Sequence, residues 1–86
     1  MSREIYWSKE AAKDLEFWKK TNRPVAVKIA KLIENIKNDP FKGIGKPEPL
    51  RFSLSANWSR RISAEHRLVY EVTDAEIIIV SCRFHY

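Results

Sequence analysis

The stretch that decides the fold runs from Trp58 to Val72 and reads WSRRISAEHRLVYEV. Apolar and polar residues alternate on both sides of a short polar segment, SAE, which is a pattern typical of a β-hairpin. A three-residue turn at this segment pairs Ile62 with His66 and places Arg61 directly opposite Arg67 on the neighbouring strand. Two like charges in this position destabilise a sheet by up to about 1 kcal/mol unless an anion lies near them.

Phosphate is the anion that best matches two neighbouring arginines, because the planar guanidinium group presents a fork of donors that fits phosphate oxygens. The alternatives are that a carboxylate of Glu48, Glu65 or Glu71 neutralises the pair, or that both side chains extend into solvent. The hairpin by itself leaves phosphate binding and these alternatives open.

The length and composition predict one folded domain that spans residues 1–86. The chain has 86 residues, of which 44% are hydrophobic, so it can build one modest core and no second module. A single cysteine, Cys82, excludes an intramolecular disulfide. No apolar run approaches the roughly 20 residues that a membrane-spanning helix needs, and no signal peptide is recognisable. We therefore expect a cytoplasmic protein.

The charge predicts an acidic partner. Sixteen Lys and Arg against eleven Asp and Glu give a formal net charge of +5. A nucleic acid, an acidic protein and a membrane surface all fit this charge.

Two helices are predicted between an N-terminal strand, Glu4 to Trp7, and the rest of the chain. The first extends from Lys9 to Thr21, with Ser8 as its N-cap. The second extends from Pro24 to Asn38 and has the clearest apolar period in the chain. Lysines occupy the other sides of both helices and most simply form a solvated surface.

Strands are predicted at Leu50 to Leu54 and at Glu76 to Arg83, in addition to the hairpin. This order of elements predicts an α+β fold in which a small antiparallel β-sheet carries both helices on one face. The opposite face of the sheet is then free for function. Alternation along the hairpin puts His66 on the core side, where a structural role is the simpler interpretation.

The segment from Pro40 to Pro49, PFKGIGKPEP, contains three prolines and both glycines of the chain, so it must be an irregular loop. Its most notable residue is Glu48, which lies between two prolines. Such a stiff backbone suits a catalytic base or a plain solvated turn, and the loop alone favours the turn.

The residue types favour acid–base chemistry without a metal or other cofactor. Two histidines and one cysteine show no zinc-ligand spacing, carboxylates are not clustered, and no serine nucleophile motif is present. Acid–base cleavage needs a base, an acid and a cation over the developing charge. Glu48, His85, and Arg67 with Arg61 form one such set. RNA suits this chemistry because its 2′-OH can attack the adjacent phosphate.

Four blocks of sequence, in this order and at this spacing, resemble the YoeB/Txe family of toxins in the RelE superfamily. They are GKPEPL at residues 45–50, WSRRI at residues 58–62, EHRLVY at residues 65–70, and the terminal HY. The resemblance implies a RelE-like fold and a metal-independent endoribonuclease that cleaves mRNA in the ribosomal A site and thereby inhibits translation. It also implies a YefM-type antitoxin as partner, and a homodimer.

The resemblance also implies roles for individual residues. Glu48 matches the general base, Arg67 matches the arginine that stabilises the phosphate, and His85 matches the general acid. Tyr86 matches a terminal tyrosine that helps to orient the substrate.

Two further basic residues, Arg51 and Arg61, match positions that contact RNA. A different class of function also fits the basic hairpin: a non-catalytic module that binds RNA or protein, for example as a partner subunit of a repressor complex. Such a module would tolerate loss of Glu48 and His85, whereas an enzyme would not.

Overall fold

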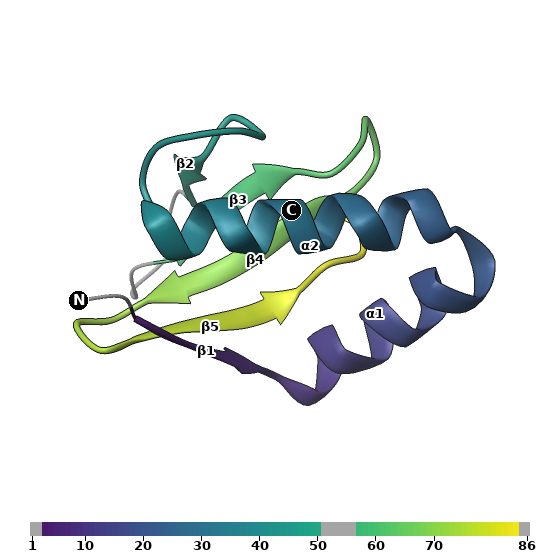
Figure 1. The fold of residues 1–86 in the computed structure, drawn as a ribbon, viewed down its shortest axis with the longest axis horizontal. Helices are drawn as coiled ribbons and strands as arrows, with labels where there is room; N and C mark the ends of the chain where they lie inside the picture. The colour runs from purple at the N-terminus through teal and green to yellow at the C-terminus, as the bar shows by residue number, and fades with distance from the viewer. Residues whose placement is uncertain (1–2, 51–56, 85–86) are drawn as a thin grey trace.

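A computed structural model describes residues 3–50 and 57–84 of the chain. In these residues two helices and five strands follow one another (Figure 1). They are β1 (Glu4–Trp7), α1 (Lys9–Thr21), α2 (Arg23–Asn38), β2 (Glu48–Pro49), β3 (Asn57–Arg61), β4 (Arg67–Val72) and β5 (Glu76–Ser81). The predicted α+β class, with both helices against one sheet, is confirmed.

The five strands form one sheet in the order β1-β5-β4-β3-β2. β5, β4, β3 and β2 pair antiparallel, as predicted, but β1 pairs parallel to β5, with Ile5 opposite Ile77. The sheet is therefore mixed. The parallel pair arises because both helices cross over between β1 and the rest of the sheet, so that β1 joins an edge next to the last strand (Figure 1).

Both helices begin at the caps that the sequence provides. The Ser8 hydroxyl accepts a hydrogen bond from the Ala11 N–H at 3.0 Å, and α1 has the predicted bounds. The Asn22 side chain caps α2, which begins at Arg23, one residue before the predicted start. The extended backbone of Asp39, just before Pro40, ends α2 as expected.

The core lies between the helices and one face of the sheet. Ile29, Leu32 and Ile36 of α2 are fully buried, and they belong to one cluster with Leu68 and Tyr70 of β4. Burial of each large aliphatic side chain contributes about 1.5–3 kcal/mol. This packing holds β3 and β4 in place, and neither of the two helices in residues 3–50 and 57–84 covers their other face, which we call the open face.

The last strand is shorter than predicted. β5 ends at Ser81, and the next residues leave the sheet toward α1. The Cys82 carbonyl accepts a hydrogen bond from the Trp18 indole N–H at 2.8 Å, and its N–H donates to the Asp14 carboxylate at 3.0 Å. α1 therefore anchors the segment that precedes the C-terminus.

The predicted strand at Leu50 to Leu54 falls almost entirely on residues 51–56, which lie outside the described residues. In the described part of the chain, no helix is long and apolar enough to cross a membrane.

Candidate active site on the open face of the sheet

The hairpin has the predicted register. Arg61 of β3 lies opposite Arg67 of β4, and the Ile62 N–H donates to the His66 carbonyl at 2.9 Å. Leu68 and Tyr70 are buried with the helices, so alternation directs Arg67 to the opposite, open face. The two arginines that the sequence singled out are therefore neighbours on adjacent strands.

Arg67 forms an ion pair with Glu48. One guanidinium nitrogen lies 2.7 Å from Glu48 Oε1 and also donates to the Ser59 hydroxyl at 3.2 Å. The Glu48 side chain is 57% exposed and the Arg67 side chain 23% exposed, so water reaches both. Of the carboxylates considered from sequence, Glu48 is thus the one that pairs with Arg67. Such an exposed pair contributes at most about 1 kcal/mol, which makes it easy for a competing anion to separate.

Arg61 is exposed beside this pair. Within residues 3–50 and 57–84, no carboxylate forms an ion pair with it. Its charge therefore adds to that of Arg67 and makes this corner of the open face attractive to a phosphate.

Backbone hydrogen bonds hold the loop that carries Glu48 against β3. The Arg61 N–H donates to the Gly45 carbonyl at 2.6 Å, and the Leu50 N–H donates to the Asn57 carbonyl at 3.0 Å. Between these bonds, Glu48 pairs with Ser59 in the short strand β2. The carboxylate of Glu48 thus projects from a backbone that is fixed at both sides.

Arg60, which sequence reasoning passed over, is the residue that organises this loop. It is fully buried and points to the helix side of the sheet. Its Nε donates to the Tyr70 hydroxyl at 3.1 Å, and one terminal nitrogen also bonds the side chain of Asn35. Its remaining acceptors are loop carbonyls: Asp39 at 2.7 Å, Lys42 at 3.1 Å and Ile44 at 3.0 Å. The alternation of the hairpin places Arg60 on the core side, and this alternation was the sequence signal that could have indicated its structural role.

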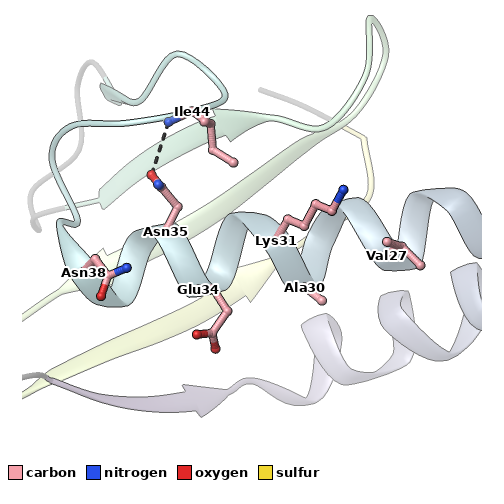
Figure 2. Close-up of a pocket in the computed structure, with 7 residues that line it drawn as sticks. All are labelled: Val27, Ala30, Lys31, Glu34, Asn35, Asn38 and Ile44. Carbon is pink, nitrogen blue, oxygen red and sulfur yellow. Dashed lines mark hydrogen bonds between the residues drawn. The ribbon is translucent and has the colours of Figure 1, made fainter.

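Tyr70 and Asn35 complete the anchoring of the loop. The Tyr70 hydroxyl donates to the Pro40 carbonyl at 2.6 Å, and burial raises the pKa of Tyr70, so the donor proton stays in place. Asn35 Oδ1 accepts from the Ile44 N–H at 3.2 Å (Figure 2). A shallow hollow of about 400 Å³ lies between Ile44 and α2, and Figure 2 shows the residues that line it. This hollow is not lined by the predicted site residues that the structure describes, Glu48, Arg61 and Arg67.

Two glycines let the loop pass close to the helix. Gly43 and Gly45 have φ angles of +132° and +81°, which disfavour any residue with a Cβ. A Cβ on Gly45 would lie 2.8 Å from Leu32 Cδ2. The two glycines therefore allow this loop to pack closely against α2.

Three residues of the predicted site cannot be placed from the structure. Arg51, His85 and Tyr86 lie outside the described residues. Phe84, the residue before His85, is described, and its carbonyl accepts a hydrogen bond from the Arg67 N–H at 2.9 Å. Phe84, the last described residue, is therefore held directly beside Arg67.

His66 lies half-buried, on the core side as predicted. Its ring meets Trp18 edge to face, with 4.7 Å between ring centroids. Its Nδ1 accepts a hydrogen bond from the backbone N–H of Phe84 at 2.7 Å.

The described residues contain no group of three or more His, Cys, Asp or Glu side chains that could hold a metal ion. The chemistry available in this part of the molecule is that of one carboxylate and two guanidinium groups. The expectation of a reaction without cofactor stays a prediction.

Comparison with known proteins assigns this chain to a family. Residues 7–86 match the family described as YoeB-like toxin of bacterial type II toxin-antitoxin system. The Escherichia coli (strain K12) protein named Toxin YoeB is 49% identical over 82 residues, which cover 95% of this chain and 98% of that protein.

Solved structures agree with the sequence match. The YoeB/ParE toxin from Agrobacterium tumefaciens superposes with a TM-score of 0.91 at 45% identity, covering 96% of this chain and 99% of that one. The Staphylococcus aureus YoeB dimer gives a TM-score of 0.91 at 39% identity, with full coverage of both chains. A heterotetrameric YoeB-YefM complex from Staphylococcus aureus gives 0.86 at 39% identity, again with full coverage of both chains.

Fold, family match and relatives together define the class: a toxin of a bacterial type II toxin-antitoxin system. The chain belongs to the YoeB-like family of these toxins, and the family resemblance seen in the sequence is confirmed.

Proposed function

We propose that this toxin is a metal-independent endoribonuclease that cleaves mRNA in the A site of the ribosome and so inhibits translation. The observation that carries the proposal is the pairing of Glu48 with Arg67, at 2.7 Å, on the face of the sheet opposite α1 and α2. A base and a phosphate-binding cation are two of the three groups that cleavage by the 2′-OH requires, and His85 is the proposed third, the acid.

In the proposed reaction Glu48 accepts the proton of the 2′-OH, whose oxygen forms a bond to the adjacent phosphorus. The bond from phosphorus to the 5′ oxygen breaks, and His85 donates a proton to that leaving oxygen. Arg67 donates to the non-bridging oxygens, where negative charge develops. The products are a 2′,3′-cyclic phosphate and a free 5′-OH, and no metal or cofactor takes part.

The ion pair between Glu48 and Arg67 is the resting state of this proposed site. In the free protein the Arg67 guanidinium donates to Glu48. When a phosphate accepts this hydrogen bond instead, the Glu48 carboxylate becomes available to the 2′-OH. Arg61 and Arg51 contribute positive charge that attracts RNA, and Tyr86 orients the substrate. Because the proposed substrate is ribosome-bound mRNA, the protein acts in the cytoplasm.

An antitoxin of the YefM type is the proposed protein partner, since the relative from Staphylococcus aureus forms a complex with YefM. The same organism's YoeB forms a dimer, and we propose a homodimer for this chain as well. A net charge of +5 favours an acidic antitoxin surface over the open face.

Primer extension on an mRNA in a reconstituted translation reaction tests the proposal. Wild-type protein should produce new ends within the A-site codon, and only when ribosomes are present. Glu48→Gln and His85→Ala should each lower the cleavage rate at least about 100-fold, because each removes a proton-transfer group. Glu16→Gln, on the exposed surface of α1, is the matched control and should cleave like wild type.

Intact message with translation still blocked would contradict the proposal and favour the non-catalytic binding module. Wild-type cleavage rates in Glu48→Gln or His85→Ala would remove the role assigned to that residue.

A further inference from the structure

The three residues before His85 are held by an unusual set of contacts that the proposed reaction does not use. Phe84, the last described residue, has both of its backbone hydrogen-bonding groups fixed to consecutive residues of the hairpin. Its N–H donates to His66 Nδ1 at 2.7 Å, and its carbonyl accepts from the Arg67 N–H at 2.9 Å. Two hydrogen bonds therefore fix the backbone of Phe84, the residue that precedes His85 in the chain.

The backbone of Phe84 does not adopt this position on its own. Its φ angle of +66° lies in the left-handed region, which raises the energy of a residue with a Cβ by about 1–2 kcal/mol. Such a conformation persists where the surroundings fix it. Of the two hydrogen bonds that fix it, the one to His66 is the one that depends on a side chain.

His66 is itself rigidly held. Its carbonyl accepts from the N–H groups of Ile62 and Ser63, at 2.9 and 3.2 Å, which closes the hairpin turn. Its ring packs against Trp18, whose indole N–H in turn bonds the Cys82 carbonyl at 2.8 Å. One imidazole thus connects the hairpin, α1 and the C-terminal segment.

The hydrogen bond also defines the state of the ring. A backbone N–H can only donate, so Nδ1 must carry a lone pair, and the ring proton of a neutral His66 lies on Nε2. An imidazolium has no acceptor and would lose this bond.

We propose that His66 is a positioning residue for the cleavage reaction: the Nδ1 acceptor of its imidazole fixes the backbone of Phe84, the residue from which the chain continues to the proposed general acid, His85. This inference rests on the proposed function, in which His85 is the general acid and Arg67 binds the phosphate. A displacement of about 1 Å in such a pair lowers a reaction rate by roughly 100-fold.

Two substitutions separate positioning from simple packing. His66→Asn keeps an oxygen acceptor close to where Nδ1 stands, whereas His66→Leu keeps an apolar side chain against Trp18 and removes the acceptor. We expect His66→Leu to lower kcat about 100-fold with little change in KM, because binding groups such as Arg67 and Arg61 remain. His66→Asn should restore kcat to within about tenfold of wild type.

An NMR experiment on the free protein tests the geometry without any enzyme assay. In ¹⁵N-labelled wild-type protein, at a pH where the ring is neutral, His66 should show an unprotonated Nδ1 and a protonated Nε2. The Phe84 amide should be protected from hydrogen exchange in wild type and in His66→Asn, and unprotected in His66→Leu. Circular dichroism and urea unfolding establish that each variant is folded before its kcat is compared.

The proposal is overturned if a folded His66→Leu cleaves at the wild-type rate, or if the Phe84 amide of wild type exchanges freely. It is also overturned if both variants lose kcat in proportion to their loss of stability, since that result describes a residue needed only for packing. If His66→Leu does not fold, the ring state, the Phe84 exchange and the activity of His66→Asn decide the question. Absence of cleavage by wild type would instead contradict the proposed function, and the His66 ring state and the Phe84 amide exchange would be unaffected by it.

Discussion

Arg60 and Arg67 lie on adjacent strands of one hairpin but have opposite environments. Arg60 is fully buried, and its guanidinium group is satisfied by the Tyr70 hydroxyl, the Asn35 side chain and three loop carbonyls. Arg67 is partly exposed and bonds one carboxylate and one hydroxyl. The face of the strand, and not the residue type, decides which arginine stabilises the fold and which is free for a substrate.

The comparison also explains why Glu48 is well placed. The helix-side arginine fixes the loop from α2 to β2, and the loop then presents Glu48 to the open-face arginine. The helix-side face of the hairpin therefore stabilises the fold, and the opposite face carries the residues of the proposed reaction.

The largest effect on stability is expected for Arg60→Met. The substitution keeps an unbranched side chain at a fully buried position but leaves the carbonyls of Asp39, Lys42 and Ile44 without their donor. We expect the free energy of unfolding to fall by about 3–5 kcal/mol, as measured by urea denaturation. A loss below about 1 kcal/mol would show that water or a loop rearrangement satisfies these carbonyls. It would contradict the role of Arg60 in stabilising the fold.

A smaller loss is expected for Gly45→Ala, which strains the same loop without touching Arg60. Gly45 has a φ of +81°, and an added Cβ would lie 2.8 Å from Leu32 Cδ2 and 3.2 Å from the Arg61 carbonyl. We expect the free energy of unfolding to fall by about 2 kcal/mol in urea denaturation. A variant as stable as wild type would contradict the close packing of this loop on α2.

The buried thiol of Cys82 provides a readout of folding that is independent of both arginines. Burial, and secondarily the nearby Asp14 carboxylate, raise the pKa of Cys82 to about 12. Native protein should therefore fail to react with a thiol reagent at neutral pH, and should react on unfolding.

The sign of the pH effect follows from the same shift. The pKa of this thiol is higher in the folded state than in the unfolded state, where it is about 8.5. The protonated thiol thus contributes stability at neutral pH, and this contribution is lost as the pH rises above about 8.5 toward 12. Urea denaturation across this range should show the decline, and rapid labelling of native protein at neutral pH would contradict the burial of Cys82.

Much of the fold was predictable because local signals agreed with it. Ser8 and the apolar period of the second helix gave α1 and α2 to within one residue, and alternation gave the Arg61–Arg67 register. The parallel placement of β1 was not predictable, because an edge strand carries no local mark of its partner. The end of β5 at Ser81 was missed because the cause is Trp18 and Asp14, far away in sequence.

The candidate site divides in the same way. Glu48 and Arg67 were predicted together, and the structure brings them together. The role of Arg60 was missed because its partners are carbonyls of an irregular loop, whose positions no pattern predicts. His66 was correctly placed on the core side, but its bond to Phe84 depends on a turn after β5 that leaves no trace in the sequence.

The measurement that tests the account most directly compares cleavage and stability in Arg67→Ala. The ion pair with Glu48 is partly exposed, so the free energy of unfolding should change by less than about 1 kcal/mol. Cleavage of mRNA in a reconstituted translation reaction should fall by about 100-fold or more, because a donor to the developing charge is gone. Arg23→Ala, at the exposed start of α2, is the control and should change neither quantity. Cleavage at the wild-type rate in Arg67→Ala, or a loss of activity matched by unfolding, would contradict the assignment of the open face to catalysis.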